Sequence, residues 1–292
     1  MYENNKDSFL PYIILTVAIT IIIYFIVNFY LIRENFQGVV AGELYAQALY
    51  QPSFLPINSS SFKEYRTFVI NLKKTETGKK RWALMKGTVF ANTMERYDAI
   101  NGHIYDCSKE VSKNIITTSW DFGMWKNGKT NYIKMTPGEI GVSLSHYYIW
   151  KKMVDEDIEK AIILEDDSSD IDPYFEEKFH NIMKSMPCDW DIVLISFWLH
   201  KGDNGKQVNG DVSRVKDFVF MNAYVINTRG AKKLCDKSPI DMPLDSWVSK
   251  MSKDVVIYRH HHQTSSITPR GILISQASKQ IVGSSIDHTN NW

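Results

Sequence analysis

The feature that most constrains the fold of this chain is an apolar run that ends abruptly in three acidic residues. The run AIIL occupies positions 161–164, and EDD follows at 165–167. A continuous run of aliphatic residues of this length is typical of a strand that is buried on both faces. Charged residues can follow such a strand only where the chain leaves the core. The pattern therefore predicts a buried strand whose carboxyl end carries a polar site.

The chain around this run alternates short apolar runs with amphipathic segments. Further strands are predicted at Thr67–Ile70, Asp191–Phe197 and Phe218–Ile226, and helices at Lys79–Thr93, about Pro173–Met186 and Arg229–Asp236. This alternation predicts an α/β domain with a mostly parallel central sheet.

The clearest helix start lies at Thr136. Its side chain can cap a helix, Pro137 suits the first helical position, and Glu139 completes a capping box three residues after the cap. We therefore expect a long helix that begins at residue 137 and leads to the strand at 161–164.

The first part of the chain predicts a membrane anchor. Residues 9–32 carry no charge and are long enough to cross a hydrocarbon core of about 30 Å as a helix. A cleaved signal peptide is the alternative, but its apolar core is normally shorter and follows a cationic segment. We therefore expect a tail at 1–8, an anchor at 9–32, a Pro/Ser-containing stem at 33–64 and a folded domain at 65–292.

Composition excludes several classes of protein. With 44% hydrophobic residues the chain lacks the signature of disorder, and a net charge of +1 without long basic runs argues against a nucleic-acid partner. The three cysteines are scattered, without the close pairs of a zinc site or the density of a disulfide scaffold.

The acidic triplet carries the chemistry. Three adjacent carboxylates beside a low-dielectric core repel one another, and a bound divalent cation offsets that cost. Alternate side chains of a strand share a face, so Glu165 and Asp167 are expected to point into one cleft while Asp166 points away or reaches a ligand from the turn. Hard oxygen ligands suit Mg²⁺ or Mn²⁺. The alternative is a solvated acidic turn that caps the following helix.

Ordered sequence blocks support the first interpretation. They are FVINL at 68–72, RW at 81–82, RYDAING at 96–102, TPGEIGVSLSHYYIW at 136–150, AIILEDD at 161–167, WDIVLI at 190–195, AYVINTRGAKKL at 223–234 and PIDMPLD at 239–245. In order and spacing the chain resembles glycosyltransferase family 25, which includes bacterial lipooligosaccharide galactosyltransferases and collagen galactosyltransferases.

The resemblance implies a GT-A-like fold, a UDP-sugar donor and an inverting displacement at the anomeric carbon. In such enzymes an acidic motif binds the metal and the donor diphosphate, a role that falls here to Glu165, Asp166 and Asp167. Asn71 would approach the nucleoside. The chain departs from the family at Lys73-Lys74, where Asp-Arg is usual, and at Val142, where Cys is common. The first change affects the expected donor pocket, and the second is interpreted as core packing.

Acceptor-side residues remain open. Asp245 and Asp241 are the candidate bases for the acceptor hydroxyl, with Asp245 preferred; the alternative is that Asp245 caps a helix. His262, in a run of three histidines, is a candidate third metal ligand. His146 is either a packing residue or part of the site, and Trp150 is interpreted as core rather than as a sugar platform.

Together these features predict a membrane-anchored glycosyltransferase that uses Mn²⁺ or Mg²⁺. It would move galactose or another hexose from a UDP-sugar to a glycan, glycolipid or glycoprotein acceptor. By analogy with other anchored glycosyltransferases, the chain is expected to be a single-pass type II protein with a lumenal or extracytoplasmic catalytic domain. The alternatives are a catalytically silent glycan-binding or chaperone-like relative, and a metal-dependent hydrolase.

Overall fold

The computed structural model describes residues 64–123, 128–168, 170–172, 174–199, 205–260 and 274–275. Contacts divide the chain into residues 1–57 and 58–292, and all described elements belong to the second unit. The predicted anchor at 9–32 and His262 lie outside the described residues. Among the residues that are described, no helix is long and apolar enough to cross a membrane.

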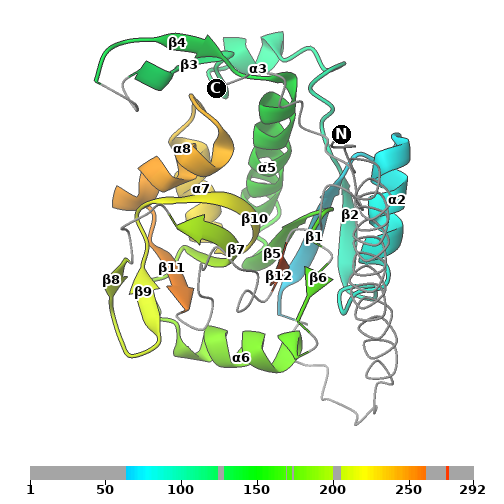
Figure 1. The fold of residues 1–292 in the computed structure, drawn as a ribbon, viewed down its shortest axis with the longest axis vertical. Helices are drawn as coiled ribbons and strands as arrows, with labels where there is room; N and C mark the ends of the chain where they lie inside the picture. The colour runs from blue at the N-terminus through cyan, green and yellow to red at the C-terminus, as the bar shows by residue number, and fades with distance from the viewer. Residues whose placement is uncertain are drawn as a thin grey trace, which may run out of the picture. The chain divides into compact units, whose positions relative to one another are not determined.

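A mixed eight-stranded sheet forms the centre of the domain (Figure 1). In spatial order its strands are β2 (Met94–Asp98), β1 (Arg66–Asn71), β5 (Lys160–Glu165), β10 (Phe218–Asn227), β7 (Ile192–Leu199), β11 (Ile257–His260), β9 (Val212–Arg214) and β8 (Lys206–Gln207). Strands β2, β1 and β5 run parallel, as do β7 and β11. Strand β10 runs antiparallel to both of its neighbours, and β9 runs antiparallel to β11. The α/β class is confirmed, and reversed strands make the sheet mixed.

Helices cover both faces of this sheet (Figure 1). The elements are α2 (Glu76–Met85), α3 (Ser108–Ser112), α5 (Pro137–Asp155), α6 (Phe175–Ser185), α7 (Thr228–Asp236), α8 (Leu244–Lys250) and the 3₁₀ helix η1 (Met251–Lys253). One apolar cluster joins α5, α7 and α8 to the sheet, and the other joins α2 and α6 to it. Strand β5 contributes Ala161 and Ile163 to the first cluster, and Ile162 and Leu164 to the second. Its continuous apolar run therefore serves two cores at once.

Two short antiparallel strand pairs lie outside the main sheet. One consists of β3 (Ser119–Asp121) and β4 (Tyr132–Lys134), and the other of β6 (Asp170–Ile171) and β12 (Ile274–Ser275).

The start of α5 matches the prediction in detail. The Thr136 hydroxyl accepts from the Glu139 N–H, and the Glu139 carboxylate accepts from the Thr136 N–H. The helix predicted at Lys79–Thr93 is wrong at both ends, because Thr75 caps α2 and the helix stops at Met85. Residues 86–93 form successive turns that lead into β2, with backbone hydrogen bonds from the Ala91 N–H to the Thr88 carbonyl and from the Met94 N–H to the Phe90 carbonyl.

Candidate functional site

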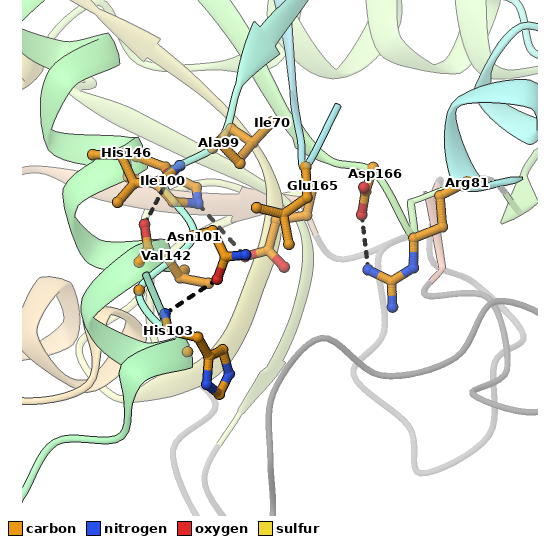
Figure 2. Close-up of a pocket in the computed structure, with 15 residues that line it drawn as sticks. Ile70, Arg81, Ala99, Ile100, Asn101, His103, Val142, His146, Glu165 and Asp166 are labelled. Atoms are coloured by element: carbon orange, nitrogen blue, oxygen red, sulfur yellow. Dashed lines mark hydrogen bonds and ion pairs between the residues drawn. The ribbon is translucent and has the colours of Figure 1, made fainter. Parts of the chain in front are cut away.

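A cleft opens at the carboxyl ends of β1 and β5 (Figure 2). These strands are paired in parallel with Ile70 opposite Glu165, so the residues after them emerge side by side. The other wall comes from the loop after β2 and from the first three turns of α5. The lining residues are Ile70, Leu72, Arg81, Ala99–His103, Gly138, Gly141, Val142, Ser145, His146, Glu165 and Asp166. Ligands of open α/β sheets bind at such an edge.

The loop after β2 is held against α5 by close backbone packing. A Cβ atom built on Gly102 would lie 1.7 Å from the Pro137 carbonyl oxygen, and one built on Gly141 would lie 2.5 Å from the Ile100 carbonyl oxygen. The Ser145 hydroxyl accepts a further hydrogen bond from the Ile100 N–H at 2.9 Å. Only glycine fits at these two positions, which explains their place in the blocks RYDAING and TPGEIG. Val142, interpreted as core packing, lines the cleft as well as the core.

Asp166 is the centre of a buried polar network. Its carboxylate accepts from Arg81 Nη1 at 2.8 Å and from Asn71 Nδ2 at 2.6 Å. The Asn71 oxygen in turn accepts two bonds from the Arg96 guanidinium, and the Asn71 amide also donates to the Gly78 carbonyl. Burial raises the pKa of Asp166 despite the opposing effect of Arg81. Asn71, predicted to approach the nucleoside, is buried in this network and contacts Asp166 of the triplet.

Glu165 points away from Arg81 and toward His146 of α5 (Figure 2). Its Oε1 lies 3.5 Å from His146 Nε2, and a quarter of its side chain is exposed. Burial, followed by the charges of Asp166 and Asp245, raises the pKa of Glu165 to about 7. Burial also lowers the pKa of His146 to about 3, so this imidazole is neutral at neutral pH.

A chain of buried side chains stands behind His146. Its Nδ1 lies 2.8 Å from the Tyr224 hydroxyl, which also accepts from Trp150 Nε1 at 2.8 Å. Because Tyr224 can donate its one proton to Nδ1, the arrangement favours the tautomer that carries hydrogen on Nε2 and directs it toward Glu165. Trp150 is fully buried, which confirms its interpretation as core.

Asp167 lies on the Arg81 side of the triplet, with its Oδ2 4.0 Å from Arg81 Nη1. Strand β5 ends at Glu165, so the alternation expected for Glu165 and Asp167 does not extend beyond it. Glu165 and Asp166, rather than Asp167, line the cleft. Asp166 and Asp167 thus lie toward Arg81, whereas Glu165 lies toward His146.

The triplet fits a metal ion only in a restricted sense. Within the described residues, no three His, Cys, Asp or Glu side chains are grouped to hold an ion. Mg²⁺ commonly uses one or two protein carboxylates and takes its other ligands from substrate phosphates and water. Glu165 offers such hard oxygens to the cleft, whereas Asp167 has the same chemistry but lies outside the cleft lining, on the Arg81 side.

Asp245 is the second residue of α8, and Asp241 lies three residues before the helix begins. The helix begins at Leu244 with Pro243 at the capping position, so the interpretation of Asp245 as a helix cap is wrong. Its carboxylate accepts from the Phe220 N–H at 2.8 Å and from the Ser246 N–H at 2.7 Å. Asp241 instead pairs with Lys250 at 3.2 Å.

Three residues of the site carried no role in the sequence interpretation. Arg81 and Arg96 stood inside recognised blocks, but nothing in their local pattern shows that they converge on Asp166 and Asn71. Tyr224 lies in the apolar strand β10, where a tyrosine reads as core. Arg81 is buried in α2, where such a charge requires an anionic partner, but this burial is visible only in the structure.

Comparisons with known proteins agree with these blocks. Residues 65–201 match the family model described as glycosyltransferase family 25 (LPS biosynthesis protein). A glycosyltransferase 25 family member from Aedes aegypti is 34% identical over 123 residues, covering 40% of this chain and 20% of that protein. Procollagen galactosyltransferase 2 from Homo sapiens is 27% identical over 214 residues, covering 68% of this chain and 32% of that protein. The chain thus spans between a fifth and a third of the length of these relatives.

Proposed function

Because the chain belongs to glycosyltransferase family 25, we propose that it transfers a hexose from a UDP-sugar to a glycan, glycolipid or glycoprotein acceptor. Galactose is the favoured sugar, since several matched relatives, including the one from Homo sapiens, are named procollagen galactosyltransferases. The observation that supports the proposal most strongly is the acidic triplet at the carboxyl end of β5. It lies beside a cleft whose other wall is formed by the close packing of the loop at 99–103 against α5 at Gly102 and Gly141.

The donor diphosphate belongs in this cleft, near the triplet. Glu165 and Asp167 would hold Mn²⁺ or Mg²⁺, which supplies positive charge to the leaving diphosphate. Arg81 adds a fixed cation at the same edge, and its pairing with Asp166 keeps that carboxylate in place. The tight approach of the loop 99–103 to α5 shapes the wall against which the nucleotide would bind.

In an inverting transfer the acceptor oxygen attacks the anomeric carbon as the bond to the diphosphate breaks. The acceptor proton passes to a carboxylate, and Asp245 is the proposed acceptor of that proton, with Asp241 as the alternative. The two backbone N–H groups that bind Asp245 fix its orientation, and a carboxylate retains further lone pairs for a proton. Asp245 is close enough to Glu165 for its charge to raise the pKa of that residue.

We extend the proposal to membrane anchoring through residues 9–32, with the catalytic domain on the lumenal or extracytoplasmic side. The charge-free span followed by a Pro/Ser-containing stem supports this topology. Protease treatment of sealed membranes should leave residues 65–292 protected. Complete digestion of that domain would reverse the orientation.

A donor screen tests the proposed reaction. Full-length protein is incubated with Mn²⁺ and a series of nucleotide sugars, and nucleoside-diphosphate release is measured with and without glycan acceptors. One UDP-hexose should give release that rises on addition of an acceptor. Release that is independent of any acceptor would indicate a hydrolase, and no release from any donor would indicate a silent relative.

A further inference from the structure

An exposed aromatic residue in an unfavourable backbone conformation lies beside the proposed catalytic carboxylates. Phe220 has a φ of 59°, in the left-handed region that bulky side chains rarely occupy. Phe220 is also a large apolar residue at the surface, with 51% of its area exposed to solvent. Both features cost free energy, and residues of this kind gather at ligand sites, where the surrounding structure imposes them.

The neighbouring structure holds Phe220 in this position. The register between β10 and β7 shifts between Val219 and Ala223, so the intervening residues form an irregularity in the strand. Asp245 accepts from the Phe220 N–H at 2.8 Å and thereby fastens this irregularity to the first turn of α8. The conformation is thus fixed by the same carboxylate that we propose as proton acceptor.

The position of Phe220 relative to the acidic triplet follows from the strand pairing. Ala223 lies opposite Leu164, the residue before Glu165. Asn222 contacts the turn after the triplet, since its carbonyl accepts from Ser168 Oγ at 3.1 Å. Phe220 comes two residues earlier, beyond this edge and on the α8 side, and it does not line the cleft assigned to the donor.

We propose that Phe220 is the platform on which the acceptor sugar stacks. The C–H face of a pyranose ring can bury apolar area on an exposed aromatic ring while its hydroxyl groups stay hydrated. A sugar placed there would present a hydroxyl to Asp245, which is bonded to the backbone of the same residue. This inference rests on the proposed glycosyl transfer and adds the residue that selects and orients the acceptor.

Kinetics of Phe220 variants provide the test. In Phe220→Ala the KM for the glycan acceptor should rise on the order of tenfold, since one aromatic contact contributes about that factor. UDP affinity should be unchanged. Phe220→Tyr, which keeps the ring, should behave like the wild type, whereas Phe220→Leu, which keeps apolar bulk, should resemble Phe220→Ala. Tyr174→Ala, at an exposed aromatic residue near α6, serves as the matched control and should change nothing.

Other outcomes overturn the inference. An unchanged acceptor KM in Phe220→Ala, or full function in Phe220→Leu, would show that the ring is not needed. An equal loss of UDP affinity would place Phe220 on the donor side instead. Failure of the proposed function is distinguishable, because the wild type would then show no acceptor-dependent release of nucleotide. In that case ligand-observed NMR can still compare binding of the acceptor glycan to wild type and Phe220→Ala in the presence of UDP.

Discussion

At the scale of single residues, three adjacent carboxylates acquire different roles from their surroundings. Asp166 is paired with a buried arginine, Glu165 faces a neutral histidine, and Asp167 is placed on the Arg81 side. The sequence predicted that the triplet forms a site, because acidic residues after an apolar strand emerge at a sheet edge. It could not predict which carboxylate is structural, since that depends on Arg81, which is 85 residues away from Asp166.

Replacement of Asp166 should therefore affect stability. Asp166→Asn leaves the Arg81 guanidinium buried without its closest counter-charge, which we expect to lower the free energy of unfolding on the order of 3 kcal/mol. Asp155→Asn, which breaks an exposed pair with Lys151, is the control and should cost less than about 1 kcal/mol. Denaturant unfolding of both variants makes the comparison. Equal free energies of unfolding in Asp166→Asn and Asp155→Asn would show that the Asp166 network contributes little to the stability of the fold.

At the scale of elements, the cleft depends on how closely the loop at 99–103 approaches α5. Gly141→Ala would place a Cβ atom 2.5 Å from the Ile100 carbonyl and 2.9 Å from the Gly102 nitrogen. Because both contacts are backbone atoms, the loop must shift. We expect a net destabilisation of about 1–2 kcal/mol, since overpacking outweighs the higher helix propensity of alanine. UDP affinity should fall as well.

The control for this variant is Gly210→Ala, since no atom lies within 4 Å of the position of its Cβ. Thermal unfolding and UDP titration of both variants separate the effect of the clash between α5 and the loop at 99–103 from the general effect of replacing a glycine by alanine. Wild-type UDP affinity in Gly141→Ala would show that the nucleotide does not use this wall of the cleft.

The elements that were predictable carry strong local patterns. Strand β5 and helix α5 followed from an apolar run and a capping box, and both formed as expected. Strand β2 was missed because its sequence MERYD contains three charged residues and no apolar run, and it forms one edge of the sheet. The reversed direction of β10 depends on long-range pairing, which an apolar strand does not reveal.

At the scale of the whole molecule, Asp191 joins several elements and should make stability depend on pH. It is fully buried between Arg229 and Lys233 of α7, and accepts from the Val256 N–H before β11. Burial alone would raise the pKa of Asp191, but Lys233, the Val256 N–H and Arg229 outweigh burial and hold its pKa below the usual value.

A carboxyl group with a lowered pKa contributes stability above its unfolded pKa of about 3.9 and loses it as the pH falls through the folded value. The free energy of unfolding should therefore decline below about pH 4. In Asp191→Asn the stability at pH 7 should be lower and this acid-dependent decline smaller. Urea unfolding at pH 7 and pH 3 measures both effects. An identical decline in the two proteins would exclude Asp191 as its source.

If the acidic triplet and a divalent cation together bind a UDP-sugar donor, transfer must depend on both of them. Transfer from the UDP-hexose identified by the donor screen is measured for wild type and Asp167→Asn, in Mn²⁺ and in excess EDTA, with thermal unfolding in parallel. We expect Asp167→Asn to keep its fold and to lose transfer, and EDTA to stop the wild-type enzyme, because the leaving diphosphate then lacks its neutralising charge. Full activity in excess EDTA would show that no divalent cation takes part in transfer. Full activity in Asp167→Asn would show that this carboxylate is not needed.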